Sequence, residues 1–236
     1  MTTRSPEWAV VCDFDGTIAC TDVTDGILSR FALPEWESIE TEWLAGKIGS
    51  RECMERQIAL VRATREELDA FLDTVEIDPD FAAFVDDCHA YGLPLRVVSD
   101  GLDYGIQRIL CRAQLDYLPV TANRLVERRP GQYQLEFPHF QPGCRAASGT
   151  CKCALACGHA PRRTLLIGDG CSDFCLAAEA SHVFAKDKLL AHCQHRRLAH
   201  SAFTDFKDVR KLLARLIGHE QQAIKQDDNL EQVING

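Results

Sequence analysis

Short apolar segments that end in small or acidic residues, each followed by a helical pattern, constrain the fold of this chain most. Residues 8–14 read Trp-Ala-Val-Val-Cys-Asp-Phe, and similar runs occupy residues 94–99 and 163–168. A nearly continuous apolar run of this length is typical of a strand buried on both faces of a parallel sheet. A further strand is expected at residues 182–185. Strands that alternate with helices predict an α/β domain with a mainly parallel sheet.

The segment between the first and second predicted strands shows no strand pattern. Residues 22–75 read as several helices, including one over 50–63 with Ser50 as its N-cap. Thr64 begins the next helix, and Glu67, three residues later, completes a capping-box pattern. This segment predicts a helical insertion after the first strand.

Two further elements are expected in the C-terminal half. Residues 119–137 predict a hairpin with Arg129-Pro-Gly-Gln as its turn. After them, apolar residues at helical spacing predict a last helix, namely Phe206, Val209, Leu212, Leu213 and Leu216.

The length of 236 residues allows one full domain and a smaller insertion. We therefore expect a core of residues 1–20 and 86–218 and a helical insertion of residues 21–85. The polar tail, residues 219–236, is expected to fray.

The charge and hydropathy of the chain limit the classes of partner that it can bind. The formal net charge of −9 disfavours a general nucleic-acid or anionic-membrane surface. No apolar run approaches the roughly 20 residues that span a bilayer, and the first seven residues lack a signal-peptide cleavage site. We expect a cytoplasmic protein that binds neither nucleic acid nor membrane, as a monomer or homodimer.

The motif Asp13-Phe-Asp15-Gly16-Thr follows directly on the first strand. In an open α/β sheet, ligands bind outside the carboxyl ends of the strands. Asp13 and Asp15 are one residue apart, so both can reach a hard cation such as Mg²⁺, one by its side chain and one by its backbone carbonyl. Gly16 permits a tight turn after the pair.

A candidate phosphate site follows the second strand. Ser99-Asp100-Gly101 offers a hydroxyl and backbone N–H groups at what we expect to be a helix N-terminus. Lys152, which opens a helix before the next strand, adds a cation. Taken alone, Ser99-Asp100-Gly101 would be interpreted as an ordinary N-cap and Lys152 as a surface lysine.

Two carboxylates surround another strand-to-helix turn in Gly168-Asp169-Gly-Cys-Ser-Asp173. Either carboxylate alone could cap the helix. Both together suit a metal ligand with a supporting partner.

These four elements, in this order, resemble the four motifs of the haloacid dehalogenase (HAD) superfamily of phosphohydrolases. The similarity spans roughly residues 9 to 217. It implies a Rossmann-like core with a helical cap inserted after the first motif, in agreement with the strandless segment. The position and length of this cap resemble the subgroup that includes phosphoserine phosphatase.

The resemblance also implies roles for the motif residues. Asp13 would attack phosphorus and form an aspartyl phosphate, and Asp15 would act as general acid and then general base. The acid/base group favours a phosphatase over relatives that displace halide or pump metal ions. Mg²⁺ would be held by Asp13, the carbonyl of Asp15, Asp169 and, through water, Asp173, while Ser99, Asp100, Gly101 and Lys152 would bind the phosphoryl group.

A narrower resemblance suggests a substrate. Residues 98–104, the cysteine-flanked Lys152 and residues 183–187 resemble the phosphatases of methionine salvage, which act on 2-hydroxy-3-keto-5-methylthiopentenyl-1-phosphate. Phosphoserine, phosphocholine and phosphoethanolamine stay open as alternatives. An ammonium group in the substrate would favour an aromatic or acidic lining, which Trp36, Trp43 or Tyr104 could supply if they do not belong to the core.

Three residues of the insertion bear on this choice. Gln57 aligns best with the position where phosphoserine phosphatases place an arginine for the substrate carboxylate, and glutamine cannot make that charged bidentate contact. A shift of one residue would place Arg56 there instead. Asp22 is either a substrate contact at the cap entrance or a helix N-cap.

The sequence holds 12 cysteines, four of them close to Lys152: Cys144, Cys151, Cys153 and Cys157. Thiolate clusters can hold structural Zn²⁺, but this spacing is not that of a zinc ribbon. Zinc, a redox disulfide and free thiols all stay open, and zinc or oxidation here could displace Lys152. Two non-enzyme alternatives are a retired phosphatase fold and a metal-binding regulator built on these cysteines.

Overall fold

A seven-stranded sheet forms the centre of the computed structural model, which describes residues 8–157 and 163–218. The strand order is β4-β3-β2-β1-β5-β6-β7, and every pairing except that of β3 with β4 is parallel. The strands are β1 (Trp8–Cys12), β2 (Leu95–Leu102), β3 (Val120–Arg129), β4 (Gln132–Glu136), β5 (Arg163–Gly168), β6 (His182–Ala185) and β7 (His200–Ala202).

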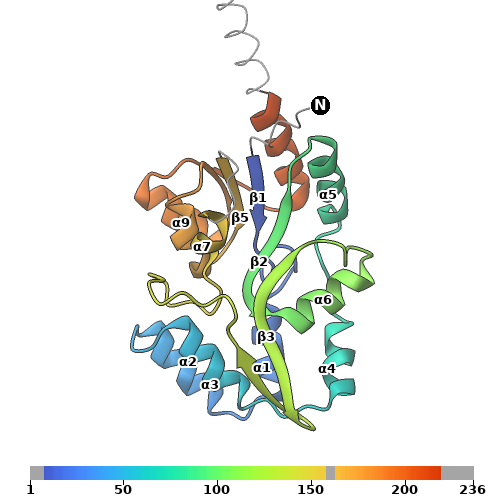
Figure 1. Cartoon of the computed structure of the whole chain (residues 1–236), viewed down its shortest axis with the longest axis vertical. Coiled ribbons are helices and arrows are strands. Elements are labelled where there is room, and N and C mark those ends of the chain that lie inside the picture. The colour runs from blue at the N-terminus through green and yellow to red at the C-terminus, as the bar shows by residue number, and fades with distance from the viewer. Residues whose placement is uncertain (1–7, 158–162, 219–236) are drawn as a thin grey trace, which may run out of the picture.

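Helices cover both faces of the sheet, α5 and α6 on one side and α7 and α9 on the other, while α1 to α4 gather at one end (Figure 1). The helices are α1 (Val23–Phe31), α2 (Trp36–Leu44), α3 (Ser50–Ile58), α4 (Arg65–Leu72), α5 (Phe81–Ala90), α6 (Asp103–Arg112), α7 (Lys152–Cys157), α8 (Phe174–Ala177) and α9 (Asp187–Arg196), with a 3₁₀ turn at Cys171–Asp173.

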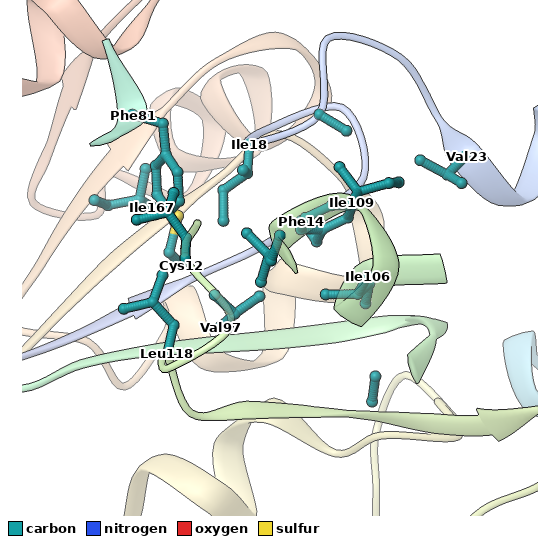
Figure 2. Close-up of a cluster of buried hydrophobic side chains, with 14 of the residues drawn as sticks. Cys12, Phe14, Ile18, Val23, Phe81, Val97, Ile106, Ile109, Leu118 and Ile167 are labelled. Atoms are coloured by element: carbon teal, nitrogen blue, oxygen red, sulfur yellow. The ribbon is translucent and has the colours of Figure 1, made fainter. Parts of the chain in front are cut away.

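The central strand β1 is buried on both faces because its apolar side chains alternate between two cores. Val10 and Cys12 belong to the larger core, on the side of α5 and α6, whereas Val11 packs with Leu166 and Val183 in the other core. Figure 2 shows part of the larger core, around Cys12. This burial explains why β1 reads as a continuous apolar run.

The structure confirms the predicted strands at residues 163–168 and 182–185, and it confirms the strand predicted over residues 8–14, which ends earlier, at Cys12. The second strand is longer than predicted, because β2 continues to Leu102, which pairs with Asn123 of β3. The prediction of a helix N-terminus at Ser99 was therefore wrong. β7 has only three residues, and the sequence analysis missed it.

The helical insertion is confirmed between β1 and β2. The capping box of Thr64 and Glu67 is also present. Two details were wrong: Gly49, rather than Ser50, is the N-cap of α3, and this helix ends at Ile58. The proposed boundary between residues 85 and 86 lies within α5, whose Phe81 and Phe84 rings pack against Phe206 on the core side.

The predicted hairpin is present, with β3 and β4 joined at Pro130 and Gly131. Residues 206–218 form the expected last helix up to the limit of the described chain, and the predicted tail lies outside it. None of the described helices is long and apolar enough to span a bilayer.

Candidate active site

Three adjacent strands bring the predicted motifs together at one edge of the sheet. β1 lies between β2 and β5 and is parallel to both, so the carboxyl ends of the three strands lie at the same edge of the sheet. The residues that follow these strands therefore lie close together. A cavity of about 960 Å³ opens at this edge, between the sheet and the helical insertion. Its lining includes Asp13, Asp15, Ser99 and Asp169.

Asp13 is held by contacts to both carboxylate oxygens. Its Oδ1 accepts a hydrogen bond from the backbone N–H of Phe14 (2.8 Å), and its Oδ2 lies 2.7 Å from Nζ of Lys152. The hydroxyl of Ser172 lies 3.4 Å from the same Oδ2. The side chain is nearly buried yet lines the cavity, so a fixed carboxylate faces the space where a substrate would lie.

Asp15 lies over the backbone of Gly101. A Cβ atom at Gly101 would come within 2.2 Å of Oδ2 of Asp15, so a larger residue there would displace this carboxylate. The Oδ1 atom accepts a hydrogen bond from the backbone N–H of Val23 (2.9 Å) at the start of α1. Burial raises the pKa of Asp15, and the negative charges of Asp22 and Asp13 reinforce the effect. A carboxyl group with a raised pKa can carry a proton to a leaving group.

Asp13, Asp169 and Asp173 form a carboxylate group in which the ligand atoms lie within 4.8 Å of one another. Thr17 donates to Oδ1 of Asp169 (2.7 Å), and a Cβ at Gly168 would come within 2.3 Å of Asp173. Burial raises the pKa of Asp169 to about 6 and that of Asp173 to about 8, with the charge of Asp13 the next cause in both.

This group fits a divalent cation. Mg²⁺ prefers carboxylate oxygens, and three carboxylates beside a single lysine leave an excess of negative charge that a cation would neutralise. The predicted contribution of the Asp15 carbonyl stays a prediction.

Lys152 lies between Asp13 and Asp173, with Nζ 2.7 Å from a carboxylate oxygen of each. Its side chain is fully buried. Burial lowers the pKa of this ammonium group, but the two carboxylates outweigh that effect and hold it above its ordinary value. Lys152 therefore stays protonated, and its contact with a bound phosphoryl group stays a prediction.

Ser99 and Asp100 both line the cavity, but their side chains have different hydrogen-bond partners. Ser99 lines the cavity, and its Oγ accepts a hydrogen bond from the N–H of Gly101 (2.9 Å). The Asp100 carboxylate instead accepts hydrogen bonds from Ser50 (2.7 Å), Asn123 (3.0 Å) and the N–H of Thr150 (2.9 Å). Asp100 thus uses its side chain to join other segments, and its contact with a bound phosphoryl group stays a prediction.

Sequence reasoning missed this network around Asp100. Asn123 and Thr150 are fully buried and hydrogen-bonded to each other (3.0 Å). Thr150 stands two residues before Lys152, so the network fixes the start of α7. The partners come from segments 50, 23 and 50 residues away in the chain, and no local pattern marks them.

The structure separates Gln57 from Arg56. Gln57 lines the cavity, whereas Arg56 is not among its lining residues and binds Glu42 (2.7 Å) at the surface. Asp22 lines the cavity and is also the N-cap of α1, because its Oδ1 atom accepts a hydrogen bond from the backbone N–H of Asp25 (2.9 Å). Of the three aromatic residues considered, Trp43 lines the cavity, while Trp36 and Tyr104 pack against the core.

The cysteines beside Lys152 do not form a metal site among the described residues. Cys151 and Cys153 cluster with Cys175, and Cys144 packs against them. All four are free thiols, and the carboxylates above are the one described group of three or more ligands close enough for an ion. The structure therefore gives no support to structural zinc. The side chain of Cys157 lies outside the described residues, and the sequence analysis missed Cys175.

Comparison with known proteins agrees with this geometry. The family model described as haloacid dehalogenase-like hydrolase matches residues 10–178, which hold all four motifs. The chain belongs to this family. Within the HAD family, it resembles the phosphatase "2-hydroxy-3-keto-5-methylthiopentenyl-1-phosphate phosphatase" of Geobacillus thermodenitrificans, with 32% identity over 87% of this chain and 94% of the relative.

The protein of the same name from Geobacillus kaustophilus is 30% identical, again over 87% of this chain and 94% of the relative. Among solved structures, a phosphoserine phosphatase with a phospho-aspartyl intermediate analogue covers 89% of this chain and 99% of its own, with a TM-score of 0.65 and 18% identity. That likeness concerns the fold. The family match and the relatives that are named as phosphatases show that the chain is a HAD-type phosphatase.

Proposed function

We propose that this protein is a Mg²⁺-dependent phosphomonoester hydrolase that acts through an aspartyl phosphate, with Asp13 as nucleophile. The observation that carries this proposal is that Asp13 lies 2.7 Å from a buried ammonium group and belongs to a group of three carboxylates suited to a metal ion. The ammonium group, together with a cation held by the carboxylates, would offset the repulsion between a carboxylate nucleophile and an anionic phosphate.

The residues divide the two chemical steps between them. A carboxylate oxygen of Asp13 forms a bond to phosphorus while the bond between phosphorus and the ester oxygen breaks. The departing ester oxygen takes the proton of Asp15. Asp15, now ionised, removes a proton from water, whose oxygen attacks phosphorus and releases phosphate and the Asp13 carboxylate. Mg²⁺ bound by Asp13, Asp169 and Asp173 would neutralise charge on the phosphoryl oxygens.

We propose 2-hydroxy-3-keto-5-methylthiopentenyl-1-phosphate as the substrate. The relatives of that name, about 30% identical over most of both chains, support this choice. The cavity also supports it over phosphoserine, because Gln57 lines the wall where a carboxylate-bearing substrate would need a cation.

An amine-bearing ester is the second candidate. The wall of the cavity formed by the insertion carries Asp22, Asp25 and Glu40, together with the ring of Trp43. Carboxylates and an aromatic ring attract an ammonium group, and phosphoethanolamine and phosphocholine both have one.

Phosphate release from a panel of esters tests both candidates. The panel holds the enol phosphate, phosphoserine, phosphoethanolamine, phosphocholine and p-nitrophenyl phosphate, each with Mg²⁺ and with EDTA. A preference for the enol phosphate that EDTA abolishes would support the proposal. A preference for the amine esters would retain the phosphatase and discard methionine salvage, and no Mg²⁺-dependent release at all would overturn the function itself.

A further inference from the structure

Gln57 lines the cavity and is hydrogen-bonded to a carboxylate on the neighbouring helix of the insertion. Its side chain is 3% exposed and lines the cavity from α3. Its Nε2 atom donates a hydrogen bond to Oε2 of Glu40 on α2 (2.9 Å), and the thiol of Cys53 lies 3.8 Å from the same oxygen. Glu40 and Cys53 line the cavity as well.

This contact fixes which end of the amide faces the ligand. An ionised carboxylate only accepts hydrogen bonds, so the NH₂ group of Gln57 must face Glu40. The carbonyl oxygen Oε1 then points away from Glu40, and no residue of the described chain donates a hydrogen bond to it. Glu40 thereby turns Gln57 into a hydrogen-bond acceptor toward its remaining neighbour, the ligand.

The charged residues of the insertion that line the cavity also disfavour an anionic group of the substrate. Three of the cavity-lining residues from the described insertion are acids, namely Asp22, Asp25 and Glu40. No lysine or arginine of the described insertion lines the cavity. The nearest arginine in sequence, Arg56, binds Glu42 instead. On this wall a carboxylate of the substrate would meet negative charge and an acceptor oxygen. The cations that line the cavity, Arg145, Lys188 and Arg196, come from outside the insertion.

We infer that Glu40 and Gln57 together form a specificity site that rejects carboxylate-bearing phosphate esters and accepts esters with a hydrogen-bond donor, a hydroxyl or an ammonium group, at this position. Glu40 acts by orienting Gln57 and by its charge, and Gln57 contacts the substrate. The inference rests on the proposed function, because it assumes that the cavity holds a phosphate ester. It would apply to the enol phosphate, whose 2-hydroxyl group is a donor.

Phosphoserine and phosphoethanolamine provide the test, because they differ only in the carboxylate. The quantity measured is the ratio of kcat/KM for phosphoethanolamine to that for phosphoserine. We expect this ratio to be at least about 10 for the wild-type protein, since a like-charged group or an unpaired acceptor costs more than about 1.4 kcal/mol. Glu40→Gln removes the charge and lets the amide of Gln57 turn, so the ratio should fall about tenfold.

A matched control and a second variant make the test specific. Glu42→Gln makes the same change two residues away on α2, but its partner Arg56 lies outside the cavity, and the ratio should stay as in the wild type. The double variant Glu40→Gln/Gln57→Arg offers a bidentate cation and should lower the ratio further. Far-UV circular dichroism and a thermal melt of each variant report that it folds.

The outcomes separate this inference from the proposed function. If the wild type hydrolyses p-nitrophenyl phosphate and the ratio does not change in Glu40→Gln or the double variant, the inference is overturned although the phosphatase stands. If the wild type hydrolyses no ester, the proposed function fails, and the ratio is then taken from calorimetric Kd values of the two unhydrolysed esters. In that case a fall of the ratio in Glu40→Gln supports the site, and an unchanged ratio overturns it.

Discussion

The hydroxyl of Ser50 donates a hydrogen bond to Oδ2 of Asp100, with 2.7 Å between the two oxygens. Ser50 is the first residue of α3, in the helical insertion, and Asp100 lies near the end of β2, in the central sheet. The same carboxylate also binds the segment that leads into Lys152. One buried side chain thus connects the insertion, the sheet and the lysine that faces Asp13.

Replacement of Ser50 by alanine should destabilise the protein. The Asp100 carboxylate would keep its bonds to Asn123 and Thr150 but lose one charge-assisted donor, at a cost of about 1–2 kcal/mol. Chemical denaturation measures this loss. Ser38→Ala is the control, because Ser38 is exposed on α2 and bonds only the backbone of its own helix. Equal effects of the two substitutions would contradict the role of Asp100.

Replacement of Lys152 by methionine should be more costly. The ammonium group is fully buried between Asp13 and Asp173, and its removal leaves two buried carboxylates unpaired, at a cost of about 3–5 kcal/mol. Denaturation in EDTA measures the loss, and added Mg²⁺ should restore part of it. Lys211→Met, which removes an exposed ion pair with Asp208, should leave the midpoint nearly unchanged. A stability of Lys152→Met equal to that of the wild type would show that the ion pairs contribute little.

Asp13→Asn should abolish turnover without loss of the fold. The amide keeps the shape of the carboxylate but is not a nucleophile, so kcat should fall by on the order of 10⁴-fold or more, as for other covalent nucleophiles. Loss of one of three neighbouring carboxylates should leave the Tm unchanged or raise it. Phosphate release and a thermal melt check the two halves, and near-normal turnover would exclude Asp13 as the nucleophile.

The stabilisation by Mg²⁺ should increase with pH. The folded-state pKa values of Asp169 and Asp173, about 6 and about 8, lie above the ordinary value of 3.8. Between pH values of about 4 and 8, the folded state therefore binds more protons than the unfolded state. The metal-free protein should lose stability as the pH rises through this range. A cation relieves that repulsion, so the shift of Tm by Mg²⁺ should be larger at pH 8 than at pH 5, at constant ionic strength. Asp169→Asn should reduce the difference, and a larger shift at pH 5 would contradict the sign.

Local patterns were sufficient for the framework of the site. Asp13, Lys152 and Asp169 were placed correctly because each stands at a strand end or a helix start that short apolar runs and turn residues mark. Burial on both faces makes such a run recognisable without any knowledge of its neighbours. The sequence also indicated the capping box at Thr64, because its two partners are three residues apart.

The errors occurred where distant segments decide the local conformation. Ser99 was expected to start a helix, yet Asn123 and its neighbours in β3 extend β2 to Leu102. Ser50 was read as an N-cap, although its hydroxyl instead bonds Asp100, 50 residues away. A strand or a cap read from sequence reflects local preference, and tertiary contacts override that preference.

The sequence by itself determined the fold class and each of the four motifs, because these depend on residue types at short spacings. The chemistry expected of Asp13 followed from the resemblance of these motifs to those of the HAD superfamily. Only the tertiary structure decided that Gln57 rather than Arg56 lines the cavity, that Glu40 lies against it, and that Asp100 serves as an anchor. Those relationships join side chains 17 to 50 residues apart. Packing of helices against one another and against the sheet brings these side chains together, and no local sequence pattern encodes such packing.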